Sequence, residues 1–111
     1  MADIRRIEDV SVLDELIETA KDRPVWFFKH SLTCPISAGA WSDFRRFAAD
    51  QDGDGAVYAL IEVQTARPVS NALAERLGVR HQSPQAILLR EARVAWHASH
   101  YDIDLNALRS A

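Results

Sequence analysis

The sequence contains a single cysteine, and this scarcity excludes several classes of small protein. Cys34 is the only cysteine among 111 residues, so no disulfide can form within the chain. Small secreted domains commonly depend on such bridges for their stability. The fold must therefore rest on a hydrophobic core. Cys34 itself is an inert core residue, a reactive thiol or a partner in an intermolecular disulfide.

The sequence also lacks a strong excess of charge and any long apolar run. The formal net charge is -3, with acidic and basic residues mixed along the chain, so no basic stripe is available for nucleic acid or an anionic membrane. Residues 1–9 contain no apolar stretch typical of a signal peptide, and the run 56–61 is too short to span a bilayer. We expect a cytoplasmic protein that binds neither nucleic acid nor membranes.

Glycine and proline are scarce, with four of each, and the remaining composition is that of a globular protein. Hydrophobic residues make up 48% of the chain and charged residues 26%, which are ordinary values for a folded domain. The length suffices for one hydrophobic core but not for two. We therefore predict one domain over residues 1–111.

The order of predicted elements is typical of an α/β sheet flanked by helices. Apolar spacing and turn residues predict helices and strands in the order α-β-α-β-α-β-β-α, with Ser11 as the first helix's N-cap. This order predicts a four-stranded mixed sheet in a single thioredoxin-like domain. The elements are expected at residues 10–20, 25–30, 35–48, 56–63, 68–77, 85–90, 93–98 and 104–108.

Cys34 lies where a predicted strand leads into a predicted helix. Unpaired backbone N–H groups and the positive end of the helix dipole stabilise an anion at such a position. Pro35 fits the first helical turn, because its missing N–H would have no partner there. The thiolate, which is the nucleophilic form of cysteine, is therefore favoured. This placement predicts that Cys34 is catalytic.

Ser37 stands three residues after Cys34, where a dithiol oxidoreductase would carry its second cysteine. Its hydroxyl is expected to donate a hydrogen bond to the thiolate, but it cannot resolve a mixed disulfide. The resolving thiol must then come from another molecule. Lys29 and His30 would each add positive charge, although strand alternation lets only one of them face the site readily.

Ser83 and Pro84 precede the predicted strand 85–90 and follow a predicted helix. This position matches the cis-proline loop of thioredoxin folds, where the residue before the proline pairs with the bound thiol peptide. The sequence leaves the isomer of this bond open. We expect the substrate-binding surface to include Lys29, Thr33, Pro35, Ser83 and Pro84.

Three segments of the chain resemble the monothiol bacilliredoxin (YtxJ-like) family of bacillithiol-system redox proteins. They are residues 28–37, 81–85 and 96–100. The Thr-Cys-Pro-Ile-Ser run at residues 33–37 is the identifying motif, and the likeness covers nearly the whole chain.

The resemblance implies a thioredoxin-like fold and the removal of bacillithiol from oxidised protein cysteines. Cys34 would accept the bacillithiol group as a mixed disulfide, with Pro35 and Ser37 as its motif partners and Ser83 with Pro84 as the docking loop. A second bacillithiol would regenerate the enzyme. Bacillithiol is then a co-substrate, with no tightly bound cofactor and no metal. The expected partners are S-thiolated client proteins, bacillithiol and a flavoprotein disulfide reductase.

Other functions remain open on the residues alone. A thioredoxin-like binding module would keep the fold without redox catalysis, and a glutathione-dependent reductase or thiol peroxidase would also use a lone cysteine at a helix start. Residues 50–55 imitate the first half of a calcium loop, but the twelfth position is Ile61 instead of glutamate. A metal-binding protein would draw its zinc or iron ligands from His30, Cys34, His81, His97 and His100.

Overall fold

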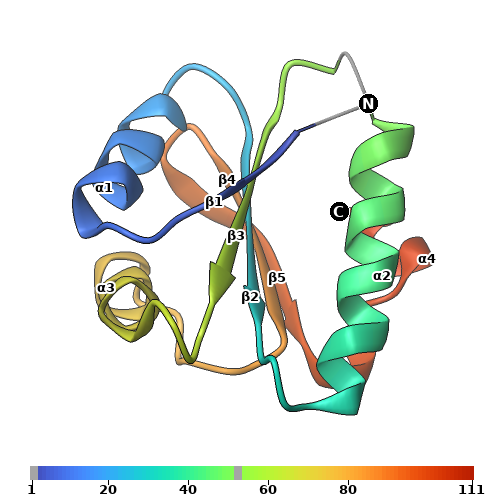
Figure 1. Cartoon of the computed structure of the whole chain (residues 1–111). Coiled ribbons are helices and arrows are strands. Elements are labelled where there is room, and N and C mark those ends of the chain that lie inside the picture. The colour runs from blue at the N-terminus through green and yellow to red at the C-terminus, as the bar shows by residue number, and fades with distance from the viewer. Residues whose placement is uncertain (1–2, 52–53) are drawn as a thin grey trace.

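A five-stranded mixed sheet lies between two pairs of helices in the computed structural model, which describes residues 3–51 and 54–111 (Figure 1). The elements are β1 (Ile4–Arg6), α1 (Val10–Thr19), β2 (Val25–His30), α2 (Pro35–Asp50), β3 (Val57–Glu62), α3 (Arg67–Leu77), β4 (Gln85–Arg90), β5 (Arg93–Ser99), a short 3-10 helix η1 (His100–Asp102) and α4 (Leu105–Ser110). The strand order is β1-β3-β2-β4-β5. Strands β1, β3 and β2 run parallel, whereas β4 and β5 are antiparallel to their neighbours.

The α/β architecture is confirmed, but the predicted count of four strands is wrong because β1 adds a fifth. Its three residues include two exposed arginines and show no apolar pattern that would predict a strand. The strand forms because its backbone pairs with the open edge of β3, where Ile4 lies opposite Tyr58 and Arg6 opposite Leu60. The pairing continues at Ile7, whose N–H donates to the Leu60 carbonyl at 2.8 Å.

The helix ends follow the capping chemistry of the sequence, with one correction. Asp9, not Ser11, is the N-cap of α1, and its carboxylate accepts a hydrogen bond from the Ser11 N–H at 2.9 Å. Asp104 caps α4 in the same way through the Ala107 N–H at 2.8 Å. Gly78 ends α3 with a positive φ of 65°, which glycine adopts without steric cost.

The sheet separates two hydrophobic layers. Helices α1 and α3 cover one face, and α2 and α4 cover the other (Figure 1). Along β2, Val25 and Phe27 point into the α1 and α3 layer, whereas Trp26 and Phe28 point into the α2 layer. Because strand side chains alternate, the next two residues, Lys29 and His30, must also face opposite layers.

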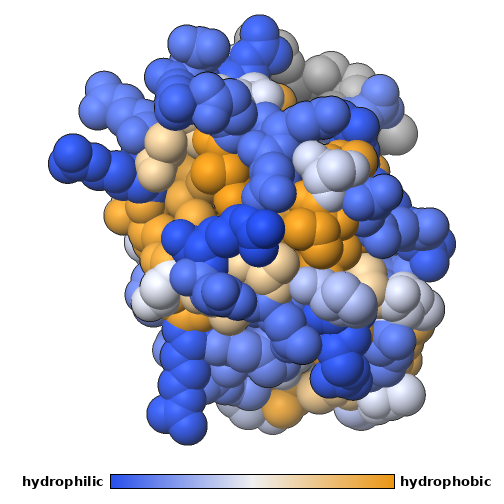
Figure 2. Space-filling model, turned by 90° about the vertical axis from the view of Figure 1, so that its left-hand side faces the viewer, coloured by the Kyte–Doolittle hydropathy of each residue, from blue (hydrophilic) through white to orange (hydrophobic). Residues whose placement is uncertain are grey.

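The face formed by α1 and α3 carries hydrophilic side chains with apolar patches between them (Figure 2). An ion pair between Asp14 of α1 and Arg76 of α3 joins the two helices across this face. In the described part of the chain, no helix is long and apolar enough to cross a membrane.

The calcium-loop imitation at residues 50–55 falls partly outside the described residues, which omit Asp52 and Gly53. The carboxylate of Asp54 serves the turn that leads into β3. One of its oxygens accepts the Ala56 N–H at 2.8 Å, and the other accepts the Tyr58 hydroxyl at 3.1 Å. This carboxylate therefore has a structural role in the turn.

Candidate functional site

Three chain segments meet at one edge of the sheet. The parallel strands β2 and β3 both end there, with His30 opposite Glu62, and the antiparallel strand β4 begins there, with Gln85 opposite Lys29. The turn that carries Cys34, the segment after β3 and the Ser83–Pro84 loop therefore lie close together. In Figure 1 this edge lies at the bottom of the molecule.

Cys34 is the N-cap of α2 and is half-buried. Its backbone is extended, with φ -104° and ψ 119°, and its side chain makes no capping hydrogen bond. Pro35 is exposed and occupies the first helical position. The thiol thus belongs to the N-cap residue of α2, whose first-turn N–H groups have no partner within the helix.

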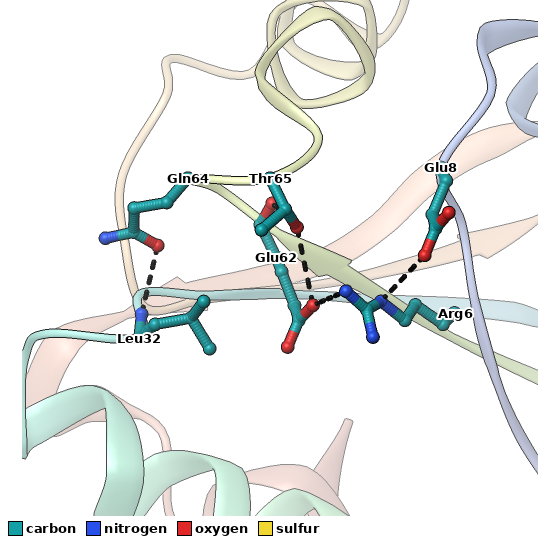
Figure 3. A network of polar contacts seen from close by, with 6 residues as sticks. All are labelled: Arg6, Glu8, Leu32, Glu62, Gln64 and Thr65. Atoms are coloured by element: carbon teal, nitrogen blue, oxygen red, sulfur yellow. Dashed lines mark hydrogen bonds and ion pairs between the residues drawn. The ribbon is translucent and has the colours of Figure 1, made fainter.

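Gln64 holds the turn before Cys34 in place (Figure 3). Its side-chain oxygen accepts the Leu32 N–H at 3.0 Å. Its amide nitrogen donates to the Ser31 hydroxyl at 2.9 Å and to the exposed Thr33 hydroxyl at 3.4 Å. Sequence reasoning missed this residue, because a single glutamine in the loop after β3 carries no motif. Only the adjacency of β2 and β3 shows its role.

Ser37 is fully buried, and its hydroxyl bonds to two groups other than Cys34. Ser37 Oγ accepts the Ser31 N–H at 2.9 Å and lies 2.8 Å from His30 Nδ1. Among the described residues, no hydrogen bond links it to the Cys34 thiol. The expectation that Ser37 donates to the thiolate is therefore corrected. This hydroxyl braces the turn, because the backbone places both of its partners within closer reach.

His30 faces the α2 layer, on the same side as Cys34's helix. Burial lowers the pKa of His30, and the nearby Arg45 lowers it further, whereas Glu62 opposes the shift. The imidazole is therefore neutral at neutral pH. Its ring stacks on Trp41 with centroids 5.8 Å apart, and the Arg45 guanidinium lies 5.5 Å above the same indole.

Lys29 faces the opposite layer and is completely buried. Its Nζ lies 3.1 Å from His81 Nδ1, which is also 3.3 Å from the Ser70 hydroxyl. Burial without a carboxylate lowers the pKa of Lys29 to about 8. This burial corrects the expectation that Lys29 belongs to the substrate-binding surface, since strand alternation turns it into the core beneath α3.

The loop before β4 contains a cis peptide bond between Ser83 and Pro84. Pro84 is buried, and its carbonyl accepts the His100 N–H at 3.0 Å. The Ser83 hydroxyl is buried and has no hydrogen-bond partner among the described residues. Both residues lie at the edge of the sheet where the Cys34 turn lies.

An ion-pair network ties β1 to the end of β3 near this site (Figure 3). Arg6 pairs with Glu62 and also with Glu8, whose carboxylate lies 3.1 Å from the Arg6 Nε. The Thr65 hydroxyl donates to the Glu62 carboxylate at 3.4 Å. The carboxylate that faces His30 is thus oriented by β1, the strand that the sequence did not predict.

Across residues 3–51 and 54–111, no group of three histidine, cysteine, aspartate or glutamate side chains is placed to hold a metal ion. Three of the candidate ligands have other partners. His30 contacts Ser37, His81 contacts Lys29, and His100 Nε2 lies 2.9 Å from the Gln82 side-chain oxygen.

Known structures with the same architecture were found by comparison. A proposed oxidoreductase with a thioredoxin fold is 30% identical to this chain, with a TM-score of 0.86 over 96% of this chain and 91% of that chain. The thioredoxin of Fasciola hepatica is 15% identical, with a TM-score of 0.74 over 96% and 94% of the two chains. Thioredoxin from Trypanosoma brucei brucei is 12% identical, with a TM-score of 0.75 over 97% and 86%.

A lone cysteine at the start of α2, on this sheet topology, defines a thiol oxidoreductase of the thioredoxin fold. The predicted thioredoxin-like fold is thereby confirmed. Residues 5–108 match the family model described as monothiol bacilliredoxin BrxC, and the chain belongs to that family. The resemblance carried by residues 33–37 is confirmed as well.

Proposed function

We propose that this protein removes bacillithiol from protein mixed disulfides. The observation that carries the proposal is the position of Cys34, the sole cysteine, half-buried at the start of α2 with Ser37 where a second cysteine would stand. A thiolate at this position attacks a disulfide but has no internal partner to resolve the product. Membership of the monothiol bacilliredoxin family supports bacillithiol as the transferred group.

The reaction balances in two exchange steps. The Cys34 thiolate attacks the bacillithiol sulfur of the client disulfide, a new sulfur–sulfur bond forms, and the client cysteine leaves as a thiolate. A second bacillithiol, deprotonated at its sulfur, then attacks the same bacillithiol sulfur on Cys34. Cys34 is released as a thiolate, and bacillithiol disulfide is the oxidised product. A flavoprotein disulfide reductase is the class of partner that would reduce this product in the cytoplasm.

The residues around Cys34 have separate roles in this proposal. Pro35 and the first turn of α2 present the thiolate, and Ser83 with Pro84 offers backbone groups to the substrate. Thr33 is exposed and directly precedes Cys34, so its hydroxyl is available to a polar group of the adduct. Ser37 and Gln64 act on the turn instead of touching the substrate.

Intact-mass spectrometry after mixing the protein with a bacillithiolated client tests the proposal. The wild type should gain the mass of one bacillithiol while the client loses it, and Cys34→Ser should gain nothing, because a serine hydroxyl is a far weaker nucleophile at neutral pH. Circular dichroism of Cys34→Ser should match the wild type. Transfer to Cys34→Ser, or transfer from a glutathionylated client alone, would contradict the proposal.

A further inference from the structure

A groove runs along α2 away from Cys34. It holds about 580 Å³ and begins at Pro35, the residue directly after the cysteine. Gly39 and Asp43 continue its α2 wall, and His100, Tyr101 and Asp104 form the opposite wall. Gly39 has no side chain to fill the groove. The space beside it is open, because a Cβ at that position would meet no atom within 4 Å.

Two exposed large hydrophobic side chains mark this end of the molecule. Tyr101 is 79% exposed, and Leu32, two residues before Cys34, is 50% exposed. No other large hydrophobic residue in the described part of the chain is exposed to this degree. Tyr101 lines the groove, and tyrosine is enriched in interaction surfaces.

Hydrogen bonds connect the groove wall formed by His100 and Tyr101 to the loop before β4. The His100 N–H donates to the Pro84 carbonyl, and the His100 ring contacts Gln82. Both partners belong to the loop that borders Cys34. Hydrogen bonds therefore connect the groove wall to the docking loop, and the groove begins at the residue after Cys34.

The charge of this surface is negative. Asp43 and Asp104 line the groove, and neither forms an ion pair among residues 3–51 and 54–111. The neighbouring arginines of α2, Arg45 and Arg46, line a different pocket that opens toward β1. A positively charged group in the groove would thus meet two carboxylates that have no ion-pair partner among the described residues, although that of Asp104 also caps α4.

We propose that this groove binds the client polypeptide through a lysine or arginine near its thiolated cysteine. The inference rests on the function proposed above. Cysteines that become thiolated are those whose thiolate is stabilised by neighbouring basic groups, so clients bring positive charge to the site. Asp43 lies nine residues beyond Cys34, about 13 Å along the helix. An extended client chain covers that distance in roughly four residues.

Bacillithiolated peptides that differ at one position test this preference. Each peptide carries a central thiolated cysteine and lysine, serine or glutamate four residues away on either side, and the rate of transfer to Cys34 is followed by intact mass after acid quenching. We expect the lysine peptide to react about fivefold faster than the serine peptide and the glutamate peptide to react more slowly. The difference should shrink at about 0.5 M salt, where such charges are screened.

Variants at the groove and outside it test whether Asp43 and Asp104 cause the preference for the lysine peptide. Asp43→Asn and Asp104→Asn should each reduce the ratio of the lysine rate to the glutamate rate, and asparagine at 104 keeps the N-cap of α4. Asp22→Asn makes the same change of charge in the segment between α1 and β2, outside the groove, and should keep the full ratio. Gly39→Phe fills the groove. It should slow the transfer from every peptide to Cys34 more than it slows the reaction of Cys34 with bacillithiol disulfide.

Each contrary outcome has a distinct meaning. Equal rates for the three peptides, with transfer intact, would overturn the docking proposal and leave the proposed function standing. If Gly39→Phe slowed the reaction of Cys34 with bacillithiol disulfide as much as the transfer from the peptides, the groove would bind the bacillithiol group. The proposal that it binds the client polypeptide would then be wrong. Absence of transfer from every peptide and from a thiolated client protein would overturn both proposals.

Discussion

Ser37 Oγ lies 2.8 Å from His30 Nδ1 and accepts the Ser31 N–H at 2.9 Å, so one buried hydroxyl joins the end of β2 to the first turn of α2. Cys34 lies between the residues that this hydroxyl connects. The position of the thiol therefore depends on a side chain that forms no hydrogen bond with it among the described residues.

Replacing Ser37 with alanine should loosen this connection. The Ser31 N–H loses its acceptor, and a buried unpaired group costs about 1–3 kcal/mol in the free energy of unfolding. Urea denaturation measures the loss, and the transfer rate to Cys34 should fall with it. Ser42→Ala, on the exposed side of the same helix, is the matched control. Unchanged stability in Ser37→Ala would show that the hydroxyl does not hold the turn.

Gln64→Glu should separate the two kinds of hydrogen bond that Gln64 makes to the turn before Cys34, the one it accepts and those it donates. Glutamate keeps an acceptor for the Leu32 N–H but loses the donor to Ser31 and Thr33. Because these groups are exposed, the loss in stability should be under about 1 kcal/mol. Amide hydrogen exchange at residues 31–33 should increase, and Gln64→Ala should increase it further. Equal exchange in all three proteins would contradict the role of Gln64.

Lys29 should make stability rise with pH above neutrality. Burial lowers its pKa from 10.5 to about 8, so between these values the unfolded chain binds more protons than the folded one. The free energy of unfolding therefore gains a contribution that grows from about pH 8 to pH 10.5. Lys29→Met removes the buried charge and should abolish this rise while matching or exceeding wild-type stability at pH 7.

Urea midpoints at pH 7 and pH 9.5 measure this difference. Other groups that titrate in the range contribute equally to both proteins, so the test is the wild type minus Lys29→Met. Lys21→Met, which changes an exposed lysine paired with Glu18, controls for the loss of a surface charge. A pH response in Lys29→Met as steep as that of the wild type would show that the Lys29 ammonium carries no burial penalty.

Ser37→Cys should give the protein an internal resolving thiol. Positions 34 and 37 are three residues apart at a helix start, which places their side chains on the same side. Oxidation should produce an intramolecular disulfide, and the bacillithiol adduct on Cys34 should become short-lived. Mass spectrometry with alkylation of free thiols detects both changes. Two thiols that remain alkylatable after oxidation would show that the side chains do not meet.

Strand β2 illustrates what local sequence could predict. Its apolar run between Pro24 and Ser31 was sufficient to place the strand at residues 25–30, and its alternation required Lys29 and His30 to face opposite layers. The sequence could not decide which of the two faces the layer of α2. That choice depends on which helices cover each side of the sheet.

Gln64 and β1 illustrate what local sequence could not predict. Neither shows a periodic apolar pattern. Both gain their structure from partners far away in the chain. Gln64 bonds to a turn more than thirty residues earlier, and β1 exists through its pairing with β3. Such contacts follow from the topology of the sheet.

The sequence alone determined the α/β class, the strand-to-helix position of Cys34 and the family, because apolar periodicity, capping residues and the motif at residues 33–37 are local properties of the chain. Tertiary structure decided the partners of each polar side chain. It buried Lys29 against His81, turned Ser37 toward His30 and brought Tyr101 to the groove that starts beside Cys34. The physical reason is that hydrogen bonds and burial depend on distances between strands and helices, which no local pattern encodes.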